Sequence, residues 1–305
     1  MPPHRGVKRS LPDESSASRL AAVGASEDTV SHTSEGRWFY AAKHREYLDT
    51  VVDNYDGGRH YHFVDMFSPH RRGADVFMYK GLQAVSCDIR GHSENFDITS
   101  KDGFLNMLNV SLALLPGGLC LAGPPCSLFI FLSQSYHRRS DSRPEGDEAV
   151  AKVRMANLIA QNFAVLAEII MDHHGFIMVE QPANSWMFKL PAFDVLKLKG
   201  CFTVHTWLCE FSHPMLKPTI LLTNLPAATM LNRKLTRKQL QERKSDPAYG
   251  MQDGLSYLRH DSKGGVSGSR RLAETATYPF EFLIAIEEAW AKDFDVHVRA
   301  HPLGA

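Results

Sequence analysis

Short apolar runs alternate along the chain with longer segments in which apolar residues recur at helical spacing. The short runs have the length of buried β-strands, whereas the longer segments have the length and period of helices. Strands are expected at residues 62–67, 83–88, 119–123, 176–180, 202–211 and 219–223. Helices are expected from Gly36 to the glycine pair 57–58 and at residues 74–80, 102–115, 148–173, 191–198 and 278–290.

This alternation predicts an α/β fold, with a mostly parallel sheet and helices on both of its faces. The connections between parallel strands are expected to be right-handed. Ligands of such sheets bind beyond the carboxyl ends of the strands. The residues that directly follow each strand are therefore the first candidates for function.

The composition supports a domain with a sizeable core, because 44% of the 305 residues are hydrophobic. No run reaches the roughly 18 apolar residues that span a membrane, and the amino-terminal segment lacks the apolar stretch of a signal peptide. We therefore expect an intracellular protein, nuclear or cytoplasmic, without membrane contact. The five cysteines form no C-x-x-C pair and no cluster has metal-ligand spacing, so neither a disulfide framework nor a metal site is expected.

Three regions differ in composition. Residues 1–34 are rich in serine, proline and charge and lack a hydrophobic period, so a disordered tail is expected there. The basic segment at residues 4–9 is typical of a nuclear signal or simply of a solvated tail. Residues 35–225 and 273–295 are expected to form one domain, with a small basic insert at residues 226–272.

The overall charge does not indicate nucleic-acid binding, since 34 acidic residues balance 34 basic ones. A local basic face is still compatible with that balance. The insert carries three basic pairs at helical spacing, Arg233-Lys234, Arg237-Lys238 and Arg243-Lys244. A helix of this kind contacts phosphates or simply solubilises the domain, and the sequence favours neither interpretation.

Acidic residues and a cysteine lie at the ends of four expected strands. Asp65 lies near the end of the first strand, and Asp88 ends the second, 23 positions later. An acid about 20 residues after a first strand is suited to bind ribose hydroxyl groups. Cys126 follows Gly123-Pro124-Pro125, and Glu180 ends the next strand. Each residue alone has a structural alternative, such as a buried thiol or a helix cap, but together they indicate one site.

In this order the residues resemble motifs of the carbon-5 cytosine methyltransferases, which use S-adenosylmethionine. Val64-Asp65-Met66-Phe67-Ser68 resembles the loop beneath the methionine part of the cofactor, and Gly123-Pro124-Pro125-Cys126 resembles the loop that carries the nucleophile. Glu180-Gln181-Pro182 takes the place of the motif with the base-binding glutamate, and Ala276-Thr277-Tyr278-Pro279 resembles the closing segment. The resemblance spans roughly residues 60–290.

The resemblance implies a Rossmann-like methyltransferase fold with a mostly parallel, seven-stranded sheet and helices on both faces. It implies methyl transfer from S-adenosylmethionine to carbon 5 of cytosine in DNA or RNA, with Cys126 as the nucleophile and Glu180 as the base-binding residue. The implied cofactor-binding residues are Asp65, Phe67, Ser68, Asp88, Ile89, Asp97, Pro124 and Tyr278. The implied substrate-binding residues are Pro125, Ser127, Arg138, Arg139, Gln181, Pro182 and Asn184.

The chain also departs from the family pattern. The loop after the first strand keeps one late glycine, Gly73, and the family's arginine-containing strand is not visible. The insert is short for a domain that reads a DNA sequence. Two alternatives therefore remain: a degenerate domain that binds a ligand or partner without turnover, and an enzyme that uses Cys126 as a hydrolase nucleophile with His137. The sequence indicates neither the exact substrate nor the oligomeric state.

Overall fold

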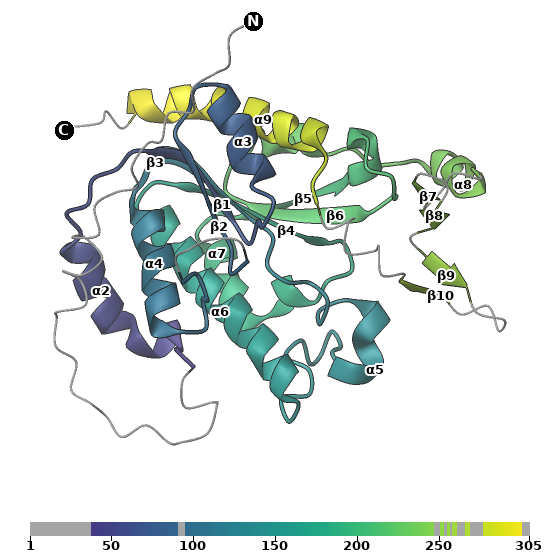
Figure 1. Ribbon diagram of the computed structural model, residues 1–305, viewed down its shortest axis with the longest axis horizontal. Coiled ribbons are helices and arrows are strands. Elements are labelled where there is room, and N and C mark those ends of the chain that lie inside the picture. The colour runs from purple at the N-terminus through teal and green to yellow at the C-terminus, as the bar shows by residue number, and fades with distance from the viewer. Residues whose placement is uncertain are drawn as a thin grey trace, which may run out of the picture.

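The computed structural model describes residues 38–90, 95–246, 251–252, 255–256, 258–260, 266–268 and 277–300. The expected tail at residues 1–34 and much of the basic insert lie outside the described residues. Within the described residues the chain forms a central sheet with helices on both faces (Figure 1).

The central sheet has six strands among the described residues, in the order β2-β1-β3-β4-β6-β5. Strands β1 to β4 run parallel, while β6 runs antiparallel to both of its neighbours. The sheet is therefore mostly parallel, as the alternation of strands and helices predicted, and it is compatible with a Rossmann-like fold. The strands are β1 (Tyr61–Met66), β2 (Ala84–Cys87), β3 (Leu114–Ala122), β4 (Phe176–Pro182), β5 (Phe202–Trp207) and β6 (Pro218–Thr223).

The expected strand at residues 202–211 is shorter in the structure. It ends at Trp207, and a 3-10 helix, η6 (Leu208–Phe211), follows it. Leu208 and Phe211 are both buried, so the residues after the strand are apolar because they pack in the core. Separately, the sheet has six strands among the described residues, where the family resemblance implied seven.

The expected helix at residues 102–115 also ends early. Helix α4 stops at Leu112, because Leu114 already pairs with Tyr61 as the first residue of β3. The Tyr61 amide donates to the carbonyl of Ala113, which lies between the two elements (3.0 Å). A run of leucines fits a helix and a strand equally well, so the sequence pattern did not reveal this boundary.

Helices cover both faces of the sheet (Figure 1). Helices α3 and α9 lie on one face, and α2, α4, α6 and α7 lie on the other. The helices are α2 (Arg45–Asp53), α3 (Arg72–Tyr79), α4 (Lys101–Leu112), α5 (Gln134–His137), α6 (Ala151–Asp172), α7 (Asp194–Leu198), α8 (Arg237–Ser245) and α9 (Phe280–Ala300). The remaining elements are the 3-10 helices η2 (Ala41–His44), η3 (Phe131–Ser133), η4 (Met187–Lys189), η5 (Pro191–Phe193) and η7 (Pro226–Leu231), and the short strands β7 (Met251–Gln252), β8 (Leu255–Ser256), β9 (Leu258–His260) and β10 (Val266–Gly268).

The central strands are buried on both faces, which explains why their sequences are almost continuously hydrophobic. In β3, Leu119 and Leu121 pack in the cluster beneath α3 and α9, whereas Cys120 and Ala122 pack in the cluster against α4 and α6. Burial of each leucine stabilises the fold by about 1.5–3 kcal/mol relative to exposure. The same alternation decides which face of the sheet a polar residue at a strand end meets.

The carboxy-terminal helix α9 belongs to the same core as the strands. Phe282 and Trp290 are buried in one cluster with Phe63 of β1 and Phe77 of α3. The Trp290 indole N–H also donates to the carbonyl of Gly117 in β3 (2.8 Å). The segments on either side of the insert therefore share one hydrophobic core.

Helix α6 has the length and hydropathy of a membrane span. Most of that helix is buried inside the protein, however, as expected for the core helix of an α/β domain. Within the part of the chain that the structure describes, no group of three or more His, Cys, Asp or Glu side chains is placed to hold a metal ion.

Candidate functional site

Cys126 and Glu180 lie at the carboxyl ends of neighbouring parallel strands. In the pairing of β3 with β4, Ala122 lies opposite Val179, so Gly123 and Glu180 follow at the same level of the sheet. Two prolines then separate Gly123 from Cys126, and their fixed φ angles stiffen the turn beyond the sheet edge. Cys126 is half-buried, whereas the other four cysteines are buried. Cys126 is therefore the thiol that a substrate reaches most easily.

The Glu180 carboxylate is buried on the α3 and α9 face of the sheet. It shares that face with Phe176 and Met178, because side chains alternate along β4. The Tyr278 hydroxyl donates a hydrogen bond to Glu180 Oε2 (3.2 Å), and the Thr219 hydroxyl lies 3.5 Å from Oε1. Strands β4 and β6 and the segment before α9 thus meet at this carboxylate.

Because Gly123 has no side chain, the Tyr278 hydroxyl can approach its backbone closely. A β-carbon at position 123 would lie 2.6 Å from the Tyr278 hydroxyl oxygen and 4.0 Å from Glu180 Oε2. The shorter distance is below any tolerable contact between carbon and oxygen, so a side chain here displaces the hydroxyl group. The glycine before the proline pair is therefore explained by the close approach of a distant tyrosine.

Charges of opposite sign act on the Cys126 thiol. Burial raises the pKa of this thiol, the negative charge of Glu180 raises it further, and Lys217 lowers it. Lys217 directly precedes β6 with a left-handed φ of 41°, and its ammonium lies 5.8 Å from the centre of the Tyr278 ring. Burial, followed by the charge of Glu180, also raises the pKa of Tyr278 well above its ordinary value. The Tyr278 hydroxyl therefore stays protonated at neutral pH and acts as a donor.

Gln181, predicted to bind substrate, lies on the opposite face of β4 and holds the proline loop. Its Nε2 donates to the carbonyl of Pro124 (2.8 Å), and the Ser185 hydroxyl donates to its Oε1 (2.9 Å). Gln181 is fully buried, while Pro182 is half-buried and Asn184 is exposed in the turn after β4. The structure thus brings Gln181 to Pro124 rather than to the Cys126 and Glu180 pair.

Arg139, also predicted to bind substrate, is fully buried in the loop between Cys126 and α6. Its guanidinium donates to the carbonyl of Leu128 (2.6 Å), to the carbonyl of Pro144 and to Asn157 Oδ1 (2.8 Å). It also stacks over the Phe129 ring at 3.9 Å from the ring centre. Burial lowers the pKa of Arg139 to about 10, which leaves it charged at neutral pH. The side chain therefore holds the loop together from within.

The neighbours of Arg139 have separate roles. Arg138 is exposed and forms an ion pair with Asp147 (3.3 Å). His137 is buried, with Nε2 2.9 Å from the carbonyl of Ile130 and Nδ1 accepting from the Arg139 amide (3.0 Å). Both ring nitrogens of His137 are thus engaged within the loop, which removes support from the hydrolase alternative.

Asp65 is a buried carboxyl group beneath the start of α3. Its Oδ2 accepts from the Gly73 amide (3.1 Å), and its Oδ1 has no hydrogen-bond partner among the described residues. Burial raises the pKa of Asp65 to about 7. A β-carbon on Gly73 would lie 2.7 Å from Oδ2, so the single late glycine of this loop lets α3 begin directly over the carboxyl group.

Phe67 and Ser68 turn the chain at the end of β1. Phe67 has a left-handed φ of 61°, and its amide donates to the carbonyl of Cys87 at the end of β2 (2.8 Å). Its ring packs edge-on against Phe163 of α6, with 5.7 Å between ring centres. The carbonyl of Ser68 accepts from the Ser86 hydroxyl (2.9 Å). The loop is therefore tied to β2 and α6 at the edge where a cofactor was predicted.

The acids predicted to bind the ribose and adenine each stabilise a local turn. Asp88 is buried, and its Oδ1 accepts from the Arg90 amide (2.6 Å). Asp97 accepts from the amide and the hydroxyl of Thr99 (3.0 and 2.7 Å). Ile89 is 65% exposed directly after Asp88. A carboxylate accepts up to about four hydrogen bonds, so these contacts do not exhaust either acid.

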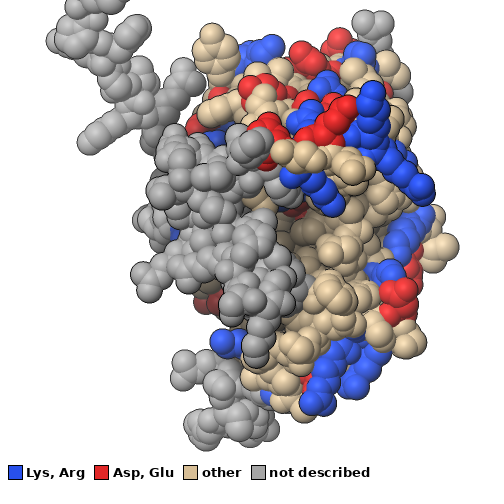
Figure 2. Space-filling model, turned by 90° about the vertical axis from the view of Figure 1, so that its right-hand side faces the viewer, with Lys and Arg blue, Asp and Glu red and all other residues tan. Residues whose placement is uncertain are grey.

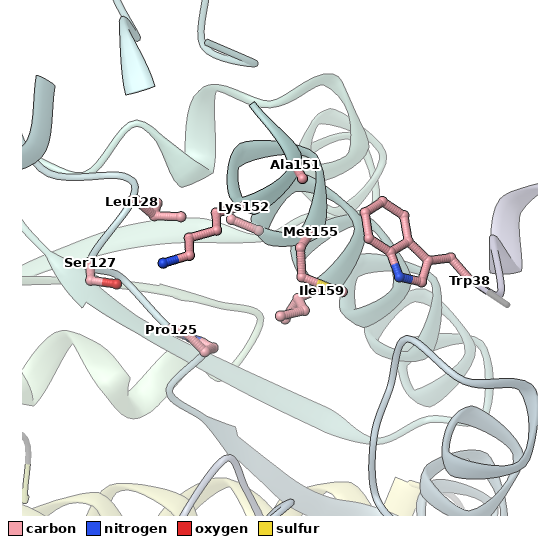
Figure 3. Close-up of a pocket in the computed structure, with 9 residues that line it drawn as sticks. Trp38, Pro125, Ser127, Leu128, Ala151, Lys152, Met155 and Ile159 are labelled. Carbon is pink, nitrogen blue, oxygen red and sulfur yellow. The ribbon is translucent and has the colours of Figure 1, made fainter. Parts of the chain in front are cut away.

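A pocket of about 340 Å³ opens beside the Cys126 loop (Figure 3). Pro125 and Ser127, which flank Cys126, form one side of it, and Met155 and Ile159 of α6 form another. The pocket is mainly apolar, and its polar groups are the Ser127 hydroxyl and the Lys152 ammonium. Its full lining is Trp38, Pro125, Ser127, Leu128, Ala151, Lys152, Met155, Ala156 and Ile159.

Charged side chains lie at the edge of a hollow on one face of the protein. Figure 2 views the side on which α8 lies, and lysine and arginine side chains, with some aspartate and glutamate among them, lie above, to the right of and below a hollow of uncharged residues there. Helix α8, the expected basic helix of the insert, has no buried side chain, and Arg237, Lys238 and Lys244 are exposed on it. Arg243 pairs with Glu210 of η6 (2.6 Å), which fastens the helix to the domain.

Sequence reasoning missed Lys217, Thr219 and Trp38. Pro182 of β4 pairs with Thr219 of β6, so the start of β6 must lie beside Glu180. The sequence therefore points to Lys217 and Thr219 only once β6 is known to lie between β4 and β5. No local pattern marks Lys217 or Trp38, because each reaches the site through a contact between distant segments.

The candidate site therefore consists of Cys126, Glu180, Tyr278 and Lys217, with an apolar pocket beside the loop that carries Cys126. No protein-family model matches this chain, and no curated protein matches its sequence.

Proposed function

We propose that this protein is an S-adenosylmethionine-dependent methyltransferase that acts on carbon 5 of cytosine in DNA or RNA. The observation that carries the proposal is the meeting of the Cys126 thiol and the Glu180 carboxylate at the carboxyl ends of two neighbouring parallel strands. A nucleophile beside a group that binds the edge of a ring is the minimum that addition to a pyrimidine requires.

The chain's own residues account for activation of the base. Cys126, as thiolate, forms a bond to carbon 6 of the pyrimidine, and the electron pair of the 5,6 double bond moves toward carbon 5 and the ring. Glu180 accepts from the exocyclic amine and, in its acid form, donates to nitrogen 3, which holds the ring over the thiol. Lys217 favours the thiolate, because its charge lowers the pKa of Cys126. Once carbon 5 carries the methyl group, loss of its proton restores the 5,6 double bond and releases the Cys126 thiolate.

Two features of the structure fit the cofactor. The pocket beside Cys126 has a volume of about 340 Å³ and combines an indole, a thioether and aliphatic side chains, which suits a nucleoside ring. Asp88 directly follows β2 as a buried carboxylate with capacity for further hydrogen bonds, which suits ribose hydroxyl groups. When bound, S-adenosylmethionine supplies the methyl group as an electrophilic sulfonium. Trp38 and Asp88 are the residues that we assign to hold its nucleoside.

A nucleic-acid substrate is supported by the lysine and arginine side chains at the edge of the hollow in Figure 2. Lysine and arginine contacts to phosphates provide most of the sequence-independent affinity for DNA and RNA. A cytosine within a duplex must leave the base stack to reach a thiol beyond a sheet edge, whereas a single strand presents it directly. The exposed residues Arg237, Lys238 and Lys244 of α8 are the proposed phosphate contacts.

Calorimetric titration with S-adenosylmethionine tests the cofactor assignment. We expect micromolar binding by the full chain, with at least tenfold loss in Asp88→Ala and in Trp38→Ala. Asp102→Ala, a change to an exposed acid on α4, is the matched control and should bind normally. Absence of binding at millimolar cofactor would overturn the assignment.

Transfer of labelled methyl groups to DNA and RNA tests the reaction itself. The wild-type chain should label cytosine-containing substrates, and Cys126→Ser should abolish labelling while it leaves cofactor binding intact. Binding without any transfer by the wild type would instead favour the alternative, a degenerate domain that binds a ligand or partner. That alternative is favoured by one observation, the raised pKa of the Cys126 thiol, which lowers the thiolate fraction at neutral pH.

A further inference from the structure

Tyr278 occupies the centre of the candidate site. Its hydroxyl donates to Glu180 Oε2 (3.2 Å) and rests against Gly123, the residue that starts the Cys126 loop. Its ring lies beneath Lys217, and its own carbonyl accepts from the Arg72 guanidinium of α3 (3.3 Å). Tyr278 is thus held at both ends, by its backbone and by its hydroxyl group.

The charged and titratable groups around Tyr278 come from five segments. They are Asp65 of β1, Arg72 of α3, Cys126 of the loop after β3, Glu180 of β4 and Lys217 directly before β6. Because the phenol stays protonated, its O–H is the donor toward a carboxylate, and Glu180 is the acceptor that the structure places within reach. The distance of 3.2 Å is longer than the roughly 2.5–2.7 Å of a strong charge-assisted bond, so this contact orients the carboxylate without a short hydrogen bond.

We propose that Tyr278 is a positioning residue for Glu180, and that its hydroxyl sets both the orientation of the carboxylate and the field that the carboxylate exerts on the Cys126 thiol. Donation to Oε2 fixes the plane of the carboxylate and leaves Oε1, 3.5 Å from the Thr219 hydroxyl, to accept from the amino group of a pyrimidine. The inference rests on the proposed function for the identity of the substrate. The contact between the phenol and the carboxylate is independent of that function.

The first experiment measures the reactivity of the thiol and needs no substrate. The rate of alkylation of Cys126 by iodoacetamide is followed from pH 6 to pH 10 in the wild type, Tyr278→Phe, Glu180→Gln and the double variant. Cys126→Ser corrects for the four buried cysteines. The phenylalanine keeps the ring contact with Phe282 of α9, so the substitution removes only the hydroxyl group.

We expect Tyr278→Phe to move the midpoint of the pH profile upward and to slow alkylation at pH 8 by roughly twofold or more, because the charge of Glu180 loses its compensating dipole. The same substitution should have no effect in the Glu180→Gln background, since glutamine carries no charge for the hydroxyl dipole to compensate. An equal effect in both backgrounds, or none in either, would overturn the proposal.

Gly123→Ala is a second, independent variant. Its β-carbon would displace the Tyr278 hydroxyl from Glu180 without altering either side chain, so it should reproduce the shifted alkylation profile of Tyr278→Phe. Tyr79→Phe removes a hydroxyl from a tyrosine that is 91% exposed on α3, and it should leave the profile unchanged. A normal profile for Gly123→Ala would contradict the role of the hydroxyl even if Tyr278→Phe failed to fold.

The turnover experiment separates this inference from the proposed function. In an active wild type, Tyr278→Phe should lower kcat about tenfold and leave the KM for S-adenosylmethionine unchanged, since the hydroxyl acts through Glu180 and not on the cofactor. An unchanged kcat would contradict the positioning role. If the wild type transfers no methyl group at all, the proposed function fails, while the alkylation cycle still decides whether Tyr278 controls the thiol through Glu180.

Discussion

The pKa of the Cys126 thiol depends first on burial and then on two residues of opposite charge. Burial raises this pKa, so the thiol of the free protein is less acidic than an exposed cysteine. Glu180, at the end of the neighbouring strand, raises it further, whereas Lys217, directly before β6, lowers it. A bound substrate or cofactor that contacts Glu180 would shift this balance.

Loss of the lysine should make the thiol less reactive. In Lys217→Met we expect the pKa of Cys126 to rise, because its nearest stabilising charge is gone, and alkylation at pH 8 to slow by roughly two- to tenfold. The pH profile of iodoacetamide labelling, read by mass spectrometry, measures the change. Lys238→Met on exposed α8 serves as the matched control. A profile identical to that of the wild type would show that Lys217 does not act on the thiol.

At the scale of elements, the loop between Cys126 and α6 is organised around Arg139. The guanidinium bonds to groups before and after it in the chain, at Leu128, Pro144 and Asn157, and so closes the loop on itself. The Trp186 amide donates to the carbonyl of Phe129 (2.8 Å) and joins the loop to the segment after β4. The position of Cys126 thus depends on a compact, hydrogen-bonded loop.

Removal of the buried guanidinium should destabilise the whole domain. Arg139→Met leaves one buried and two partly buried acceptors without their donor, and an unsatisfied buried group costs about 1–3 kcal/mol, so we expect a loss of roughly 3 kcal/mol. Urea unfolding, followed by tryptophan fluorescence, measures it. The neighbouring Arg138→Met removes a surface ion pair and should change stability by less than about 1 kcal/mol. Similar losses for the two variants would contradict the central role of Arg139.

The start of α4 depends on a glycine for steric reasons. A β-carbon on Gly103 would lie 2.2 Å from the carbonyl oxygen of Asp97 and 2.6 Å from its amide nitrogen. Backbone atoms cannot turn aside as a side chain does, so Gly103→Ala should cost at least the roughly 1–3 kcal/mol typical of overpacking. Thermal unfolding, with Asp102→Ala as control, tests this expectation. A Tm equal to that of the wild type would show that the backbone at Asp97 moves to accommodate the methyl group.

At the scale of the whole molecule, the stability should depend on the charge of Asp65. The pKa of this carboxyl group is 3.8 in a free chain and about 7 in the folded protein. Between these values the folded state holds a proton that the unfolded state has lost. The free energy of unfolding therefore falls as the pH rises through this window, and the stabilising contribution of protonated Asp65 is complete only below pH 4.

Comparison of the wild type with Asp65→Asn isolates this contribution. The asparagine still offers an oxygen to the Gly73 amide but does not titrate. The difference in unfolding free energy between the two proteins should change by up to about 1.4 kcal/mol per pH unit between pH 4 and pH 7, with the wild type losing stability. Urea midpoints at several pH values provide the measurement. A difference that does not vary with pH would show that Asp65 ionises freely in the folded state.

The sequence by itself determined the alternation of strands and helices. A buried parallel strand must be apolar on both faces, whereas the helix that connects two such strands is apolar on one face only. Since β3 and β4 are consecutive parallel strands that pair with each other, their carboxyl ends meet, and Cys126 and Glu180 were expected together from sequence alone. The boundaries of α4 and β5 were less well determined, because leucine and phenylalanine suit a strand, a helix and a core loop alike.

Only the tertiary structure decided which other residues join the site. Lys217 reaches Tyr278 because β6 lies beside β4, and the Tyr278 that the resemblance had named reaches Glu180 because α9 returns to the same face of the sheet; neither contact has a local pattern. Arg139 was expected to bind substrate, yet it is buried among acceptors from its own loop and from α6. Local periodicity reports which side of an element is apolar, whereas the partners of a buried polar group are set by long-range packing.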